Sequence, residues 1–195
     1  MRTVNVKIES VSPVLINRFK EDSEIPPKAT KGKKEYGTPR EQAELTAYCD
    51  PDTKLLWIPS SWITGTIKTV ASDYKIPGRR KSVKSVSGGA IFPTDEKIYF
   101  CEKYKVSDVE VDSRPVVIQG KDRIMRHRAR LEKWSLVFSL EVDEEILDCD
   151  TVHSILGDAG KRSGLGDYRP SKFGPFGRFK IVSWQVMEEE VKQAA

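Results

Sequence analysis

The stretch that decides the fold lies near the C-terminus, from Gly157 to Gly177, and reads GDAGKRSGLGDYRPSKFGPFG. The residues before it, from Asp143, carry apolar side chains at helical spacing, which predicts one helix or two short ones. The residues after it, from Arg178 to Met187, alternate between apolar and polar, which predicts a closing strand. We therefore expect a glycine-rich loop between a helix and the last strand.

The first part of the chain gives a similar signal. Val4, Val6 and Ile8 alternate with polar residues and predict a half-buried opening strand. A short strand is expected to end at Pro59, and Ser60 or Ser61 to cap a helix that runs to about residue 74. Ile63, Ile67 and Val70 are expected to form the buried apolar stripe of this helix. Gly65 lies inside that helix at a cost of roughly 1 kcal/mol relative to alanine, which suggests the close approach of another backbone.

Further strands are expected at 97–101, 105–111, 114–118 and 134–142, and a short helix at 39–49 with Thr38 as its cap. Without the loops, the order is strand, helix, strand, strand, helix, strand. This order predicts an α+β fold of the ferredoxin-like type (βαββαβ, RRM-like) with long basic loop insertions. We expect a single domain over residues 1–195, with insertions at about 19–50 and 75–95.

Composition narrows the class of protein. The 195 residues carry a net charge of only +4, with 32% charged and 38% hydrophobic residues, as in a globular chain with long solvated stretches. Three widely spaced cysteines favour neither a disulfide framework nor a zinc site, and fit a reducing cytosol. No apolar run approaches the roughly 20 residues of a membrane span, and the N-terminus lacks the apolar core of a signal peptide. We expect a cytoplasmic protein without cofactor, metal or membrane partner.

The charges are segregated. Basic residues cluster at 28–40, 79–84, 121–133 and 161–180, whereas acids collect at 143–145 and 188–190. Such segregation is expected of a face that binds a polyanion. Ordinary solvated loops would give the same pattern, so both interpretations stay open at this point.

The glycine-rich stretch supplies most of the candidate RNA-binding residues. Glycine lets backbone N–H groups approach a phosphate, arginine can pair with phosphate oxygens, and aromatic rings can stack on bases. The candidates are Lys161, Arg162, Gly164, Gly166, Tyr168, Arg169, Lys172, Gly174, Gly177 and Arg178. The alternative is a connector whose aromatic side chains fill the core.

Two further basic groups are candidates. Arg126, Arg128 and Arg130 would share one face of a strand and form a row of cations matched to a nucleic-acid backbone. A solvated edge strand is the alternative, because charges also protect sheet edges. Arg79, Arg80 and Lys81 form the second group, in a loop that could clamp a strand of nucleic acid.

Catalytic candidates are few. His127 lies among arginines and could serve as the base of a metal-independent ribonuclease, although it is a weak candidate. The acids Glu21, Asp22 and Glu24 could assist metal-dependent cleavage, but acids in a lysine-rich loop usually only aid solubility. No grouping suggests a nucleophile set or a Walker loop.

Three places resemble the RAMP superfamily, which provides backbone and guide-processing subunits of CRISPR effector complexes. The first is SPVLI at 12–16, after the opening strand. The second is IPSSWITGTIK at 58–68, similar to the family's IPGSSLKGALR type of helix entry. Ser60 replaces the usual glycine there, and Ile63-Thr64 departs from the usual pair. The third is the stretch from Gly164 to Gly177, which resembles the family's G-loop.

The resemblance implies a ferredoxin-like fold, RNA binding across the sheet and G-loop, and a place among other subunits of an effector complex, including self-assembly into a filament. The function predicted from it is a non-catalytic subunit that binds guide RNA in a ribonucleoprotein effector complex. Two alternatives remain. One is a metal-independent endoribonuclease that processes guide RNA, and the other is a phage structural or adaptor protein that binds protein rather than RNA.

Overall fold

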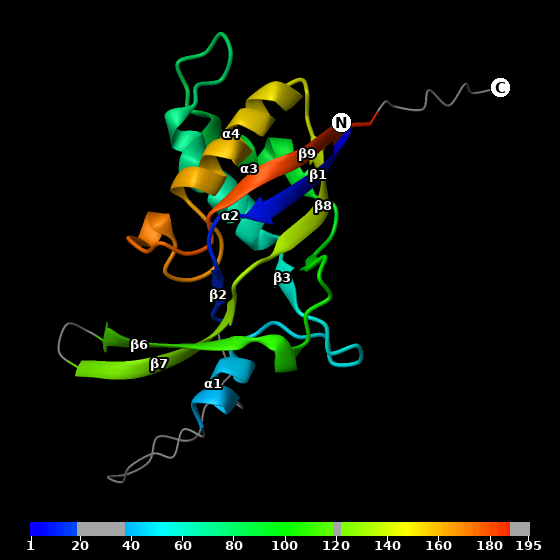
Figure 1. Cartoon of the computed structure of the whole chain (residues 1–195). Coiled ribbons are helices and arrows are strands. Elements are labelled where there is room, and N and C mark those ends of the chain that lie inside the picture. The colour runs from blue at the N-terminus through cyan, green and yellow to red at the C-terminus, as the bar shows by residue number, and fades with distance from the viewer. Residues whose placement is uncertain (19–37, 119–121, 188–195) are drawn as a thin grey trace.

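The computed structural model describes residues 1–18, 38–118 and 122–187. Its centre is a four-stranded antiparallel sheet in the order β4-β8-β1-β9 (Figure 1). The strands are β1 (Arg2–Ser10), β4 (Ile91–Pro93), β8 (Ser135–Val142) and β9 (Phe179–Val186). With helices packed on this sheet, the fold belongs to the α+β class, as the sequence predicts.

Several charged segments singled out in the sequence belong to ranges that the structure does not describe. The cations at 28–34, the acids Glu21, Asp22 and Glu24, and the acids at 188–190 lie outside the described residues. Among the helices of the described ranges, none is long and apolar enough to cross a membrane.

Strand β1 lies inside the central sheet, where it pairs with β8 on one side and with β9 on the other. Val6 lies opposite Phe138 of β8 and opposite Trp184 of β9. The alternation read from the sequence is confirmed, since Val4, Val6 and Ile8 are at most 1% exposed. Their side chains form the core beneath the helices, which fixes the register of the whole sheet.

Two helices, α2 (Ser61–Val70) and α4 (Cys149–Arg162), pack against each other and cover one face of this sheet (Figure 1). In α2 the predicted apolar stripe is buried, and the helix ends at Val70 and continues as the 3-10 turn η2 (Ala71–Asp73). Between η2 and the sheet follow a loop at 75–82, the 3-10 turn η3 (Val83–Ser85) and the short helix α3 (Ser87–Ala90).

The prediction made for Gly65 is wrong, and a different glycine makes the expected contact. The expected close approach of a backbone at Gly65 is wrong, because no heavy atom lies within 4 Å of a Cβ built there. Gly160 makes that kind of contact instead, since its Cβ would lie 2.3 Å from the carbonyl oxygen of Phe179. Helix α4 therefore runs through Gly157 and Gly160 to Arg162, and the glycine-rich loop begins only at Ser163.

A second sheet, in the order β2-β7-β6, forms an arm below the first one (Figure 1). Strands β6 (Glu110–Ile118) and β7 (Asp122–Leu131) make a long hairpin, and β2 (Val14–Ile16) pairs only with the last residues of β7. Helix α1 (Pro39–Leu45) packs against this hairpin. Thr38 caps α1 as predicted, through a capping box with Glu41.

Smaller elements complete the chain. Strands β3 (Trp57–Pro59) and β5 (Lys97–Tyr99) pair with each other, and the 3-10 turn η5 (Pro170–Lys172) lies within the glycine-rich loop. The strand expected at 105–111 is wrong for its first half, which forms the 3-10 turn η4 (Val106–Asp108). The Asp108 carboxylate accepts a hydrogen bond from the backbone N–H of Lys105 at 2.8 Å, which stabilises a turn there rather than a strand.

We predict that Asp148→Ala lowers the free energy of unfolding by about 1 kcal/mol, because the Asp148 carboxylate caps α4 by accepting from the N–H of Thr151 at 2.7 Å. That hydrogen bond holds the pKa of Asp148 below its usual value. The stabilisation is therefore complete above the unfolded-state pKa and disappears as the pH falls through the folded-state pKa. Urea unfolding of both proteins at neutral and acidic pH measures it, and a difference that grows on acidification would contradict the assignment.

Candidate nucleic-acid interface

The glycine-rich loop, residues 163–178, is tightly packed against the rest of the molecule. Gly164, Gly166 and Gly177 have φ values of 70°, 76° and 73°, which disfavour residues with a side chain. A Cβ on Gly166 would lie 2.4 Å from the carbonyl oxygen of Leu15, and one on Gly177 would lie 1.8 Å from that of Leu165. These three glycines are thus required by the path of the loop itself, whether or not a ligand is present.

The aromatic residues of the loop have different surroundings. Phe176 is buried, Tyr168 is 40% exposed, and Phe173 is 99% exposed. Tyr168 and Phe173 both have left-handed backbone conformations, and Gly174 lies directly beneath the Tyr168 carbonyl. The connector interpretation therefore holds for Phe176, while Phe173 and Tyr168 present rings on which a base could stack.

An ion pair between a buried arginine and a partly exposed carboxylate joins the loop to the hairpin. Arg128 Nε lies 2.6 Å from Asp167 Oδ2, and the Arg128 side chain is only 8% exposed. The same carboxylate oxygen accepts a hydrogen bond from Asn17 Nδ2 at 3.0 Å. Arg128 is thus held inside the protein, where its charge is offset by Asp167.

Arg114 of β6 makes a second contact between hairpin and loop. Its guanidinium lies 4.8 Å from the ring centroid of Phe176 and 5.8 Å from that of Tyr168. Its Nε also donates to both carboxylate oxygens of Asp112. Sequence reasoning missed this residue, because the spacing of Arg114 along the chain carries no sign of the rings that it meets in space.

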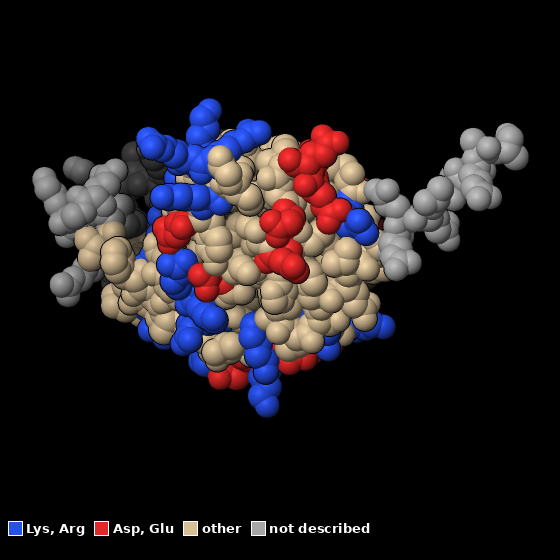
Figure 2. Space-filling model, turned by 90° about the horizontal axis from the view of Figure 1, so that it is seen from above, with Lys and Arg blue, Asp and Glu red and all other residues tan. Residues whose placement is uncertain are grey.

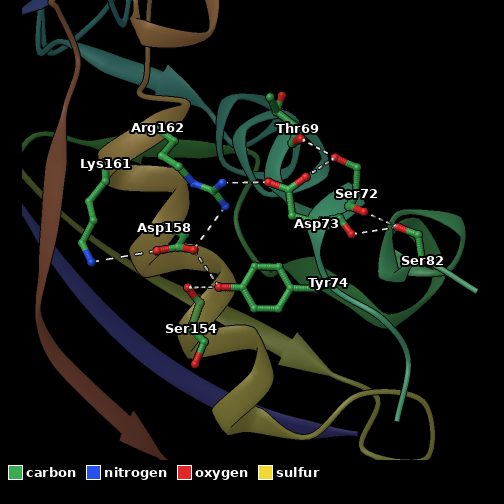
Figure 3. A network of polar contacts seen from close by, with 10 residues as sticks. Thr69, Ser72, Asp73, Tyr74, Ser82, Ser154, Asp158, Lys161 and Arg162 are labelled. Carbon is green, nitrogen blue, oxygen red and sulfur yellow. Dashed lines mark hydrogen bonds and ion pairs between the residues drawn. The ribbon is translucent and has the colours of Figure 1, made fainter. Parts of the chain in front are cut away.

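Three candidate cations of the loop region have internal partners. Arg169 donates to the carbonyl of Gly166 at 2.7 Å and to the hydroxyl of Ser171 at 3.0 Å. Arg162 pairs with Asp73 at 2.8 Å and with Asp158 at 3.2 Å, while Lys161 lies 3.9 Å from Asp158 (Figure 3). These contacts stabilise the loop and attach η2 to α4.

Tyr74 belongs to the same network (Figure 3), donating to Asp158 Oδ2 at 2.9 Å. Burial raises the pKa of Tyr74, and the hydrogen bond to Asp158 raises it further. The base of the 75–82 loop is thereby fixed against α4.

The arginines of the hairpin also differ in whether they form ion pairs. Arg130 forms ion pairs with Glu132 and with Glu110, so it is neutralised locally. Arg126 is exposed and has no ion pair within the described ranges. His127 Nδ1 lies 2.7 Å from the Ser113 hydroxyl, its partner across the hairpin.

The remaining candidates are exposed and have no ion-pair partner in the part of the chain that the structure describes. They are Lys172 and Arg178 in the glycine-rich loop and Arg79, Arg80 and Lys81 in the 75–82 loop. That second loop rises above α2 and α4 (Figure 1). Seen from above, lysines and arginines gather toward one side of this face, and acids gather nearer its middle (Figure 2).

A cleft of about 620 Å³ between α2 and α3 adds residues that the sequence analysis did not select. Lys68 and Lys84 line it, together with Gly65, Gly88 and Gly89, at which an added Cβ would meet nothing within 4 Å. Lys84 belongs to η3, which directly follows the basic 75–82 loop. Gly65, within the predicted helix, was the sequence feature that marked this cleft. The sequence alone did not show whether this glycine packs against another segment or lines an open surface.

On the face of the central sheet away from the helices, charged and polar side chains pair with one another. Lys7 pairs with Glu9 at 3.4 Å, and Asn5 accepts a hydrogen bond from Ser139 at 2.7 Å. Lys7 and Glu9 therefore offset each other on this face.

Comparison with known proteins gives the fold. No family model and no curated protein sequence matches this chain. Among solved structures, the chain matches one from the "Cryo-EM structure of the Type III-B Cmr-beta bound to cognate target RNA", with a TM-score of 0.61 and 14% sequence identity. The match covers 96% of this chain and 61% of that chain. The protein therefore shares its fold with a chain of the Type III-B Cmr-beta structure, and spans about three-fifths of that chain's length.

We predict that Asp167→Asn lowers the free energy of unfolding by about 2–4 kcal/mol, because it leaves the buried Arg128 charge without a counterion. Chemical denaturation with guanidinium measures the change. Glu132→Gln is the matched control: it removes the partner of the more exposed Arg130, and we expect less than about 1 kcal/mol. Equal effects of the two substitutions would contradict the central place of Asp167.

Proposed function

We propose that the protein is a nucleic-acid-binding subunit of a CRISPR-type ribonucleoprotein effector complex, and that its ligand is the guide RNA. One observation carries the proposal. Several internal acids neutralise Arg128, Arg130 and Arg162, whereas the cations around the α2–α3 cleft have no such partner among the described residues. Cations that no internal acid neutralises are suited to pair with the phosphates of a nucleic acid.

The element order supports a RAMP-type, ferredoxin-like assignment. Within the central sheet the chain runs β1, α2, β4, β8, α4 and β9, with spatial order β4-β8-β1-β9. We take this order as support for two interleaved split βαβ units. The three sequence stretches that resemble RAMP proteins fall on β2, on the start of α2 and on the glycine-rich loop, and the similarly folded chain comes from a complex bound to target RNA.

In the proposed complex, phosphates follow the cleft between α2 and α3. Lys68 and Lys84 contribute charge from its two sides, and the open glycines let the backbone of an RNA strand approach closely. Arg79, Arg80 and Lys81 extend the same positive surface beyond the cleft. Phe173 and Tyr168 offer stacking platforms on the glycine-rich loop.

The proposal is one of binding rather than catalysis. His127, the candidate base, lies on the β6–β7 hairpin with its Nδ1 2.7 Å from the Ser113 hydroxyl, and it does not line the α2–α3 cleft. Other subunits of the complex are the proposed protein partners, in an assembly that repeats along the RNA.

We predict that Lys68→Glu/Lys84→Glu weakens the binding of single-stranded RNA by about tenfold or more at moderate salt, since two phosphate contacts become repulsive. The slope of log K against log salt concentration should become shallower by about 1.4, for two contacts on a single strand. Fluorescence anisotropy with a labelled RNA at several salt concentrations measures both quantities.

The charge-matched control is Lys103→Glu/Lys133→Glu, which changes two exposed lysines near the β5–β6 connection. We expect this control to bind RNA within about twofold of the wild type. The α2–α3 cleft is the wrong site if both double variants lose the same affinity, and the proposed function is wrong if the wild-type protein does not bind RNA at low salt.

A further inference from the structure

Strand β9 has an open edge beside a second cleft. It pairs with β1 on one side, and in the described ranges no strand pairs with its other side. A cleft of about 340 Å³ lies between the start of this edge and α4, with Phe179 and Gly160 among its lining residues. Backbone groups of an open edge can bind a further extended segment.

The cleft is kept open by a glycine in the middle of α4. Gly157 lines it, and a Cβ at this position would meet nothing within 4 Å. Glycine inside a helix costs about 1 kcal/mol relative to alanine, and at Gly157 no close packing requires it. A larger side chain here would extend toward the space beside β9, which argues that the cleft receives a ligand.

The charges around the cleft point to an acidic ligand. Arg178 and Lys180 line it and form no ion pair with any residue that the structure describes. Lys161 is 72% exposed, and its contact with Asp158 is long, at 3.9 Å. Three cations around an apolar floor favour a short extended segment in which acids neighbour an apolar residue.

We propose that this cleft binds the acidic segment of a second copy of the chain, Glu188 to Val191, as an added strand on the edge of β9. The segment reads EEEV, so it offers three carboxylates for three cations and valine for the apolar floor. It follows β9 after one intervening residue, Met187, and lies outside the described residues.

The segment cannot reach the cleft of its own chain. From Ile181, at the cleft, to Met187 the strand spans about 20 Å at 3.3 Å per residue. Even if the chain turned straight back after Met187, the three glutamates that follow would cover at most about 10 Å of this distance. Their carboxylates therefore have to enter the cleft of another copy.

The local geometry of β9 fits a segment of this length. The pairing of β9 with β1 shifts register between Lys7 and Ile8, opposite the stretch between Ile181 and Ser183. A β-bulge bends a strand and interrupts regular pairing, so the regular edge next to the cleft is short. A segment of four residues can occupy it, with ion pairs supplying most of the attraction.

The test is a charge exchange, made on the RNA-free full chain and thus independent of the proposed RNA binding. Sedimentation velocity over a range of concentrations should show that the wild type self-associates and that salt weakens the association. Glu188→Lys/Glu189→Lys/Glu190→Lys and Arg178→Glu/Lys180→Glu should each weaken it by about tenfold or more. A mixture of the two variants should associate again, because the unchanged tail of the cleft variant fits the unchanged cleft of the tail variant, and the two reversed parts also match in charge.

The control reverses three exposed acids elsewhere, in Asp52→Lys/Glu96→Lys/Glu145→Lys, and should associate like the wild type. The inference is overturned by a wild type that is monomeric at all concentrations, or by a mixture that fails to associate. It is also overturned if the reversed tail leaves self-association intact while the reversed cleft abolishes RNA binding, which would assign the cleft to nucleic acid.

Discussion

The ion pair between Arg128 and Asp167 is the interaction on which the arrangement of the molecule depends. It joins the β6–β7 hairpin to the glycine-rich loop, and Asn17, just after β2, binds the same carboxylate. Three segments far apart in sequence thus meet at one buried charge. Removing one partner from such a pair leaves an uncompensated charge inside the protein, which strongly destabilises this arrangement.

Ion pairs within the protein also decide which cations are available to bind a ligand. Clusters that look alike in the sequence become different once their acids are placed: Arg162 meets Asp73 and Asp158, whereas Lys68 and Lys84 face an open cleft. An arginine that holds the fold together is a poor candidate for binding, because a ligand would have to compete with its internal partner. The proposed RNA surface therefore lies on α2, α3 and the 75–82 loop, while much of the glycine-rich loop has a structural role.

The glycines illustrate the same distinction. Gly160, Gly166 and Gly177 are required because another backbone lies where their Cβ would be. Gly65 and Gly157 contact nothing in this way, and both line clefts. A glycine within a helix that packs against nothing is a sign of an open surface, and the α2–α3 cleft and the cleft beside β9 are each lined by one.

The sequence by itself determined the local elements: the alternation in β1, the apolar stripe of α2, the capping of α1 by Thr38 and the α+β class all follow from periodicity and capping, which act over a few residues. It also located the cationic clusters and the glycine-rich loop. Only the tertiary structure decided that α4 continues through Gly157 and Gly160, that Arg128 is buried against Asp167, and that Lys68 and Lys84 share a cleft. The physical reason is that burial and charge pairing depend on contacts between distant segments, which no spacing along the chain encodes.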